Sequence, residues 1–193
     1  QTLAILVMMW ITTHLGVNPV LRAVDHIRKD QKIPSVGASE FRYLARTYNT
    51  MYNAYKKSIE SLIYKASHDE LTGVLNRSGY ELLLSSLDRE STYMIMLDVN
   101  NFKTINDTCG HETGDRVLVR LARVLKKHFR SEDYVCRIGG DEFVIFMVNT
   151  EKTQHDLVAS KIEDIRHELF ESKDGLPSVT ISAGIAHGSD FSD

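Results

Sequence analysis

The chain has 193 residues, which is enough for one domain of ordinary size and a smaller segment. Its hydrophobic content of 42% and charged content of 25% are typical of a globular protein, and its net charge of −3 gives no electrostatic reason to expect nucleic acid as a partner. The two cysteines, Cys109 and Cys136, form no metal-binding pattern, so we expect reduced cytosolic thiols.

Residues 2–17 (TLAILVMMWITTHLGV) carry no acidic or strongly basic side chain. The stretch is about four residues short of the roughly 20 that cross a bilayer. A buried helix and a signal peptide are alternatives, but a signal peptide has a basic start and a small-residue cleavage site, which are lacking here. Basic residues follow closely, as on the cytoplasmic side of a membrane: Arg22, Arg28, Lys29 and Lys32. We therefore expect residues 1–17 to be the C-terminal part of a transmembrane helix in the cell (inner) membrane, with residues from about 18 onward in the cytoplasm.

A short helix, a connector and a long helix come next. Pro19 opens the short helix, residues 30–39 (DQKIPSVGAS) form the connector, and Ser39 is a candidate N-cap. Apolar residues of the long helix recur at steps of three and four, with one stutter: Phe41, Leu44, Tyr48, Met51, Tyr55, Ile59, Leu62 and Ala66. This seam can pack against the chain's own domain, but we prefer a parallel coiled coil with a second copy of the chain.

The same arrangement resembles the HAMP signal-relay module. Pro19 near the start, Glu40 at the start of the second helix and residues 49–51 (NTM) match the pattern of that family. The resemblance implies that residues 18–66 form a HAMP-like module and signalling helix. In a homodimer they would build a parallel four-helix bundle that passes an external signal downstream.

Residues 67–193 predict an α+β fold with a mixed sheet covered by helices. His68 and Asp69 are ligand types, but we expect them to be hydrogen-bonded residues of a structured turn, after which Asn76 or Ser78 caps a helix. The further expected elements are a strand at 93–99, a polar loop with a short helix at 100–115, a helix at 116–129, a hairpin of strands 134–138 and 143–148, a helix at 154–170 and a strand at 177–186.

The candidate site joins the end of strand 93–99 to the hairpin tip. Gly139 and Gly140 are typical of a tight turn that uses positive φ angles, and Asp141 and Glu142 follow them. A solvated acidic turn is the simpler interpretation. The topology can, however, place Asp98 beside both tip carboxylates, and three carboxylates share a site at neutral pH only with cations present. Oxygen ligands of this kind suit Mg²⁺ or Mn²⁺ with substrate phosphates.

The polar segment after Asp98 offers groups for a nucleotide. Main-chain amides of residues 101–103 can hold phosphate oxygens. The Asn106 amide can meet guanine O6, and the Asp115 carboxylate can meet guanine N1–H and N2. Helix capping is the alternative role for both residues.

Several spaced motifs are similar to those of the GGDEF family of diguanylate cyclases: residues 139–143 (GGDEF), 69–77 (DELTGVLNR), 98–103 (DVNNFK), 105–107 (IND), 110–111 (GH), 114–115 (GD) and 182–184 (SAG). The resemblance implies a nucleotidyl-cyclase-like fold for residues 67–193. It implies that two GTP are condensed into cyclic di-GMP and pyrophosphate by a homodimer in which each subunit presents one GTP. The implied metal ligands are Asp98, the Val99 carbonyl, Asp141 and Glu142. The implied catalytic residues are Asp141, as general base, and Glu142. The implied substrate-binding residues are Asn101, Phe102, Lys103, Asn106, His111 and Asp115.

Arg130 and Asp133 match the RxxD motif at which the family binds cyclic di-GMP as an inhibitor, and Arg137 is expected on the same surface. A surface ion pair is the simpler interpretation of this motif. Asn100 departs from the family, which has an acidic residue there. The sequence also ends at Asp193, before the expected final helix whose lysine and arginine grip phosphates, so we expect this fragment to be a weak enzyme. The competing function is a GTP or cyclic di-GMP sensor for a downstream domain, such as a phosphodiesterase. A purely structural dimerisation role leaves the carboxylates unexplained.

Overall fold

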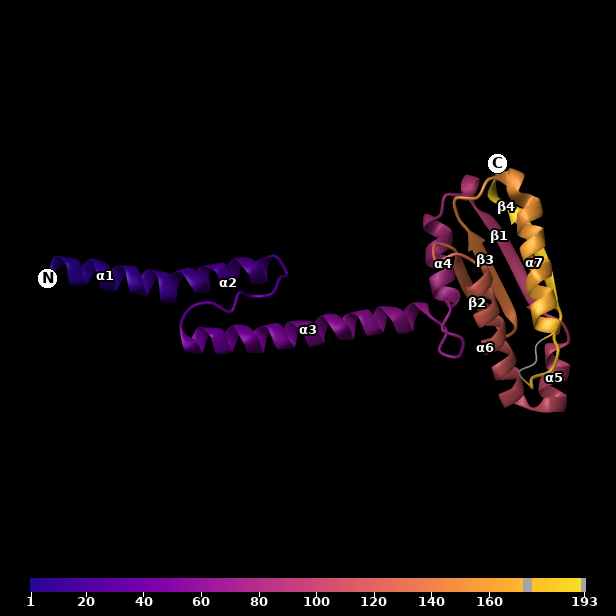
Figure 1. Cartoon of the computed structure of the whole chain (residues 1–193), viewed down its shortest axis with the longest axis horizontal. Coiled ribbons are helices and arrows are strands. Elements are labelled where there is room, and N and C mark those ends of the chain that lie inside the picture. The colour runs from indigo at the N-terminus through magenta and orange to yellow at the C-terminus, as the bar shows by residue number, and fades with distance from the viewer. Residues whose placement is uncertain (172–174, 192–193) are drawn as a thin grey trace. The chain divides into compact units, whose positions relative to one another are not determined.

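The computed structural model describes residues 1–171 and 175–191 (Figure 1). The chain divides into two compact units, Gln1–Leu62 and Ile63–Asp193, which are described separately. The boundary falls inside the long helix α3, Ser39–Ser67.

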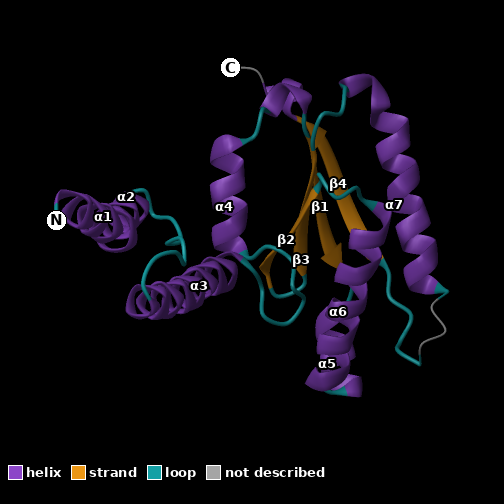
Figure 2. Cartoon of the chain, turned by 60° about the vertical axis from the view of Figure 1, so that its left-hand side comes forward, coloured by secondary structure: helices purple, strands orange, loops and turns teal. Residues whose placement is uncertain are grey.

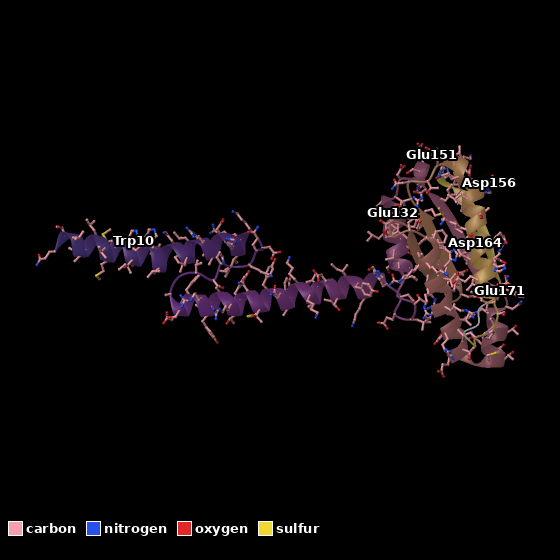
Figure 3. All side chains as sticks on the ribbon, viewed as in Figure 1. Trp10, Glu132, Glu151, Asp156, Asp164 and Glu171 are labelled. Atoms are coloured by element: carbon pink, nitrogen blue, oxygen red, sulfur yellow. The ribbon has the colours of Figure 1, made fainter. Side chains whose placement is uncertain are left out.

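The first unit begins with one continuous helix. Helix α1, Thr2–Thr12, passes through a wide π-type turn, Thr13–Val17, into α2, Asn18–Arg28. The prediction that Pro19 opens the second helix is confirmed, since Pro19 lies in the first turn of α2. The continuity of α2 with α1 through the π-type turn was not predicted. The whole helix is 27 residues long and contains an 18-residue window with a mean hydropathy of 1.5, so it is a candidate membrane span by length and composition. Trp10 points outward from it (Figure 3).

The connector between α2 and α3 is tied to α3 by side chains. The Asn49 amide accepts a hydrogen bond from the Ile33 N–H and donates one to the Ile33 carbonyl, both at 2.8 Å. Ile33 packs with Ala23 and Ala45 in a small buried cluster. Ser39 is the first residue of α3 and its hydroxyl bonds the Glu40 carboxylate, so it is not the N-cap that we expected.

The predicted seam of α3 is largely uncovered in the single chain. Leu44, Met51, Tyr55 and Leu62 have exposed fractions of 60–67%. Apolar side chains in a row on one helix gain free energy when a partner buries them. This face is thus available for a second helix.

The second unit has the α+β class that the sequence predicts. Its further helices are α4, Arg77–Ser86, α5, Phe102–Cys109, α6, His111–His128, and α7, His155–Phe170. Its strands are β1, Tyr93–Val99, β2, Tyr134–Gly139, β3, Glu142–Met147, and β4, Ile181–His187, in the sheet order β2-β3-β1-β4. The predicted mixed sheet was wrong, because the ladders between these strands are antiparallel. The parallel pairing among the described residues is a single bridge between Leu75 and Cys136.

Two predicted boundaries were wrong. Helix α6 begins at His111 instead of residue 116, because Gly110 (φ 83°) makes the left-handed turn that lets the polar run start a new helix at once. Strand β4 begins at Ile181 instead of residue 177. The segment before it is held by side chains: Arg120 donates to the Pro177 carbonyl at 2.6 Å, and the Ser178 hydroxyl donates to Phe170.

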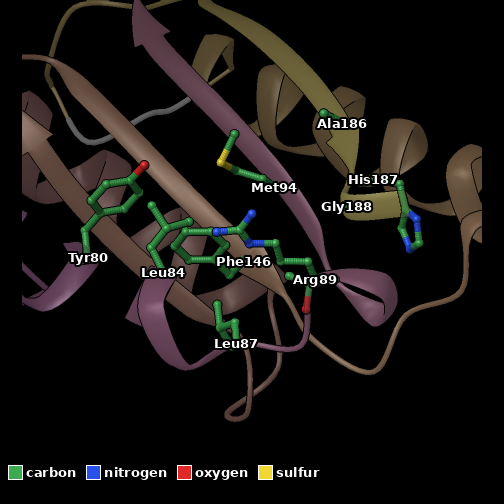
Figure 4. A pocket seen from close by; sticks show the side chains of 10 residues that line it. Tyr80, Leu84, Leu87, Arg89, Met94, Phe146, Ala186, His187 and Gly188 are labelled. Atoms are coloured by element: carbon green, nitrogen blue, oxygen red, sulfur yellow. The ribbon is translucent and has the colours of Figure 1, made fainter. Parts of the chain in front are cut away.

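The sheet separates two cores (Figure 2). Helices α6 and α7 cover one face and bury alternate strand residues such as Ile95, Leu97 and Ile145. Helix α4 covers the opposite face only in part, over Val144 and Phe146. Beside α4 an open apolar hollow of about 300 Å³ remains, lined by Tyr80, Leu84, Leu87, Arg89, Thr92, Met94, Phe146, Ala186, His187 and Gly188 (Figure 4). This half-open face ends at the candidate site.

Candidate active site

The register of β1 against β3 sets the acidic side chains. Asp98 lies directly opposite Glu142, and both side chains are exposed on the face away from α6 and α7. Opposite residues have Cβ atoms about 4.5–5.5 Å apart, so like charges there repel each other. Asp141 lies in the turn immediately before Glu142. The structure therefore brings the three predicted carboxylates to one end of the sheet.

Gly140 and Asp141 form the turn, since Gly139 already pairs with Glu142. We expected the glycine pair to supply positive φ angles, and this was wrong, because neither glycine is among those with positive φ. The two glycines matter because they lack side chains and so leave room at the turn. A Cβ atom on Gly139 would lie 3.0 Å from a Glu142 carboxylate oxygen, while nothing lies within 4 Å of the corresponding position on Gly140. The tip is thus open to a ligand.

The negative charges of Asp98, Asp141 and Glu142 repel one another, and a bound cation would relieve this repulsion. Partial desolvation, and then the charge of Asp141, raise the pKa of Asp98. In the described parts of the chain, no group of three Asp, Glu, His or Cys side chains is arranged so that it could hold a metal ion by itself. Mg²⁺ is commonly bound by one or two carboxylates, with substrate phosphates and water as the other ligands. Asp98, Asp141 and the Val99 carbonyl fit an open site of this kind by donor type.

The N-terminus of α5 provides anion-binding amides next to the carboxylates. Asn101, directly before the helix, has left-handed backbone angles (φ 58°, ψ 29°), and its side chain makes no capping hydrogen bond. The first N–H groups of a helix have no intrahelical partner and carry a partial positive charge. The amides of Asn101, Phe102 and Lys103 therefore suit phosphate oxygens.

Helices α5 and α6 meet at a glycine. A Cβ atom on Gly114 would lie 1.9 Å from Asn106 Oδ1 and 3.3 Å from Phe102, so only glycine allows this close approach. Asn106 is half-buried there, whereas Asp115 and His111 are exposed on the first turns of α6. Asn106 and Asp115 thus lie on adjoining helices. The sequence pattern alone did not indicate that Gly114 fixes the position of Asn106.

Asn100 uses its amide to attach the site loop to β4. Its Nδ2 donates to the Thr180 hydroxyl at 3.0 Å, and its Oδ1 accepts from the Ser182 hydroxyl at 2.7 Å. A carboxylate at this position has no N–H to donate. The departure from the family pattern therefore has a local structural use.

The turn after α3 is the structured turn that we predicted. Asp69 Oδ1 accepts hydrogen bonds from the Thr72 N–H at 2.9 Å and from the Thr72 hydroxyl at 2.6 Å. Burial alone would raise the pKa of Asp69, but the Thr72 hydrogen bonds and the Arg137 ion pair outweigh it and lower the pKa. His68 stacks on Tyr64 with ring centroids 3.8 Å apart. Asn76 caps α4 by accepting from the Gly79 N–H at 3.0 Å.

Arg130 and Asp133 do not form the surface ion pair considered above. Asp133 is buried, and its carboxylate accepts from the backbone N–H groups of Arg130 at 2.9 Å and Val148 at 3.2 Å. The Arg130 guanidinium lies 3.6 Å from Glu132, and its side chain is 56% exposed. Asp133 therefore shapes this loop, and Arg130 presents its charge to solvent.

Arg137 makes two contacts that sequence reasoning missed. Its Nε donates to the Gly140 carbonyl at 2.9 Å, and its Nη1 donates to Asp69 at 2.9 Å. The side chain is 15% exposed. The first contact joins Arg137 to the hairpin tip, and the second joins it to the turn after α3.

The fold and the acidic hairpin correspond to a known family. Residues 66–192 match the family described as "Diguanylate cyclase, GGDEF domain". The chain belongs to the GGDEF family. Diguanylate cyclase DgcM of Escherichia coli strain K12 is 38% identical over 139 residues, which are 68% of this chain and 33% of DgcM. The chain spans between 30% and 48% of the length of the first curated relatives that it matches.

Solved structures share the GGDEF fold. Diguanylate cyclase SiaD from Pseudomonas aeruginosa, solved with its activator SiaC, is 27% identical with a TM-score of 0.56, over 95% of this chain and 70% of that chain. The GGDEF domain of DgcB from Caulobacter crescentus, solved in complex with c-di-GMP, is 27% identical with a TM-score of 0.53, over 65% of this chain and 82% of that chain. We call the second unit the GGDEF domain from here on.

Proposed function

We propose that the GGDEF domain condenses two GTP molecules into cyclic di-GMP and releases pyrophosphate. The observation that carries the proposal is the register that places Asp98 opposite Glu142, with Asp141 at the adjoining tip. The carboxylates require cations at neutral pH, and the α5 amides beside them suit anions. A metal-bound nucleoside triphosphate satisfies both requirements at once.

Each predicted residue has a role in this proposal. Asp98, the Val99 carbonyl, Asp141 and Glu142 would hold Mg²⁺ or Mn²⁺. Such an ion, when bound, neutralises charge on the triphosphate and on the departing pyrophosphate. The amides of Asn101, Phe102 and Lys103 hold phosphate oxygens, Asn106 and Asp115 recognise guanine, and His111 lies beside the nucleotide.

The reaction needs two domains. Asp141, supported by Glu142, accepts the proton of the 3′-hydroxyl of one GTP. That oxygen forms a bond to the α-phosphorus of the second GTP, and the bond from this phosphorus to the pyrophosphate oxygen breaks. The second hydroxyl repeats the step in the opposite direction and closes the ring. Because each domain presents one GTP, we propose a homodimer as the active species.

The uncovered seam of α3 supports that homodimer. We propose that α1 and α2 anchor the protein in the cell (inner) membrane and that the unit Gln1–Leu62 acts as a HAMP-like relay. The long apolar helix and the connector held by Asn49 support this assignment. Two copies would bury the seam of α3 and bring two GGDEF domains into one assembly.

We further propose that cyclic di-GMP inhibits the enzyme at Arg130. Asp133 fixes the Arg130 backbone, so the exposed guanidinium is presented to a phosphate or a guanine of the product. Arg130→Ala is expected to raise the cyclic di-GMP concentration that gives half inhibition without changing the uninhibited rate. An unchanged inhibition curve would remove Arg130 from the product site.

The direct test follows cyclic di-GMP formation from GTP and Mg²⁺ by the full-length protein. Asp141→Asn keeps the side-chain shape but removes the charge, and it is expected to abolish product with the fold intact by circular dichroism. Asp156→Asn, on the exposed surface of α7 (Figure 3), is the matched control and is expected to keep wild-type activity. If the wild type binds GTP but forms no product, the sensor function replaces the cyclase function.

A further inference from the structure

Asn100 joins the end of β1 to the start of β4 through both its backbone and its side chain. Its N–H donates to the Thr180 carbonyl at 3.0 Å, which continues the pairing of β1 with β4 one residue beyond Val99. Its Nδ2 donates to the Thr180 hydroxyl at 3.0 Å, and its Oδ1 accepts from the Ser182 hydroxyl at 2.7 Å. These hydrogen bonds, which we call the Asn100 clamp, fix residue 100 against β4.

The start of β4 is itself held in place, so it is a firm anchor for Asn100. Ile181 is buried, and its carbonyl accepts a hydrogen bond from Arg166 Nε of α7 at 3.2 Å. Asp98 lies directly opposite Ser182 in the pairing of β1 with β4, so both residues belong to the same face of the sheet. The anchor therefore adjoins the proposed triphosphate site.

Asn101 lies between the Asn100 clamp and α5 in an uncommon backbone conformation. Its φ of 58° is left-handed, a region that residues other than glycine rarely occupy. Its side chain makes no capping hydrogen bond, and its carbonyl accepts a hydrogen bond from the Ile105 N–H at 3.2 Å, at the start of α5. Such a conformation persists where the surrounding structure holds it. The anchored residue 100 on one side and the helix on the other thus set the direction of the first amides of α5.

We propose that Asn100 is a positioning residue. Its clamp to Thr180 and Ser182 holds Asn101 in the left-handed conformation and so directs the amides of residues 101–103 toward the triphosphate. The proposal rests on the proposed cyclase function, in which these amides hold phosphate oxygens. A loop that is ordered in advance binds its ligand more tightly than a loop that must be ordered on binding. The asparagine that stands in place of the family's acidic residue supplies the side-chain N–H of the clamp.

The test measures the binding of two ligands at one fixed Mg²⁺ concentration. One is guanosine, and the other is a GTP analogue in which a methylene group replaces the oxygen between the α- and β-phosphorus atoms, so that no pyrophosphate can leave. Asn100→Ala loses both side-chain hydrogen bonds, and its affinity for the analogue should fall by about five- to 100-fold. Thr180→Val loses one of them and should show a fall of about two- to tenfold, which Thr180→Ser should reverse.

The affinity for guanosine should stay within about twofold in every variant, because guanosine has no phosphate for the amides to hold. Thr153→Val, at an exposed threonine before α7, is the matched control and should bind both ligands like the wild type. Circular dichroism checks the fold of each protein. Thr180→Val decides the question if Asn100→Ala does not fold, since Thr180 is exposed and valine keeps its shape.

Two results would overturn the proposal. Equal losses of affinity for guanosine and for the analogue would make the clamp merely structural, because the guanine-reading residues Asn106 and Asp115 would then have moved as well. Wild-type affinity for the analogue in folded Asn100→Ala and Thr180→Val proteins would show that the clamp does not direct the amides. Failure of the cyclase function is separate, since the wild type would then form no cyclic di-GMP from GTP, while binding of the analogue still decides the role of Asn100.

Discussion

Gly114→Ala tests how the structure positions the proposed guanine-reading group. The added methyl would lie 1.9 Å from Asn106 Oδ1 and 3.0 Å from its Cγ, so the amide must move away. Asn106 is half-buried between two helices, and a displaced amide would lose the proposed hydrogen bond to guanine. Loss of such a bond costs about 1–3 kcal/mol. This corresponds to an increase of about five- to 150-fold in KM for GTP.

The effect on folding is expected to be smaller. Alanine in place of a helical glycine gains about 1 kcal/mol, and crowding of a packed site costs about 1–3 kcal/mol. The free energy of unfolding of the Gly114→Ala variant should therefore fall by no more than about 2 kcal/mol. Urea unfolding with circular dichroism measures this term separately from the kinetics.

A double-mutant cycle isolates the contact between Gly114 and Asn106. Asn106→Ala alone should raise KM for GTP, and adding Gly114→Ala should then have little further effect, because the crowded amide is gone. Steady-state kinetics with GTP measure KM for the wild type, the two single variants and the double variant. Two results would refute the positioning of Asn106 by Gly114. In one, the fold-change in KM of the double variant equals the product of the fold-changes of the single variants. In the other, the Gly114→Ala enzyme has the wild-type KM.

Three further predictions concern other parts of the chain. Met51→Glu places a charge on the exposed seam of α3 and should shift the protein toward monomer in sedimentation; an unchanged dimer would exclude this seam as the interface. The hydrogen bond from His128 and the charge of Lys127 lower the pKa of Glu168, so this carboxylate stabilises the fold above its ordinary pKa of 4.5. Glu168→Gln should therefore lose stability at pH 7, and its difference from wild type should vanish as acid protonates Glu168; a pH-independent difference would contradict this. Burial raises the pKa of Cys136 to about 12, so iodoacetamide should alkylate exposed Cys109 first, and equal rates in the native protein would contradict the burial.

Hydrophobic periodicity predicted most elements of the GGDEF domain. Strand β1 has the predicted bounds, and the alternation of its side chains also explains why Asp98 faces outward while Leu97 and Val99 are buried. Boundaries shifted where a single backbone feature intervened. Gly110 started α6 early, and the widened turn before Pro19 joined α2 to α1.

The candidate site was predictable in part. The carboxylates are carried by adjacent strands, and antiparallel pairing of two strand ends is a simple topology. Contacts between distant positions were not predictable, since Arg137 and Asp69 are 68 positions apart along the chain. The buried state of Asp133 also depends on backbone N–H groups from two segments, Arg130 and Val148, which no local pattern shows.

The ratio of pyrophosphate to cyclic di-GMP tests the proposed cyclase activity most directly. Wild-type protein is incubated with GTP and Mg²⁺, and cyclic di-GMP and pyrophosphate are quantified together by chromatography and an enzymatic pyrophosphate assay. We expect two pyrophosphates for each cyclic di-GMP, and neither product from the Asp141→Asn protein. Release of inorganic phosphate in place of pyrophosphate, or equal product from the Asp141→Asn protein, would contradict it.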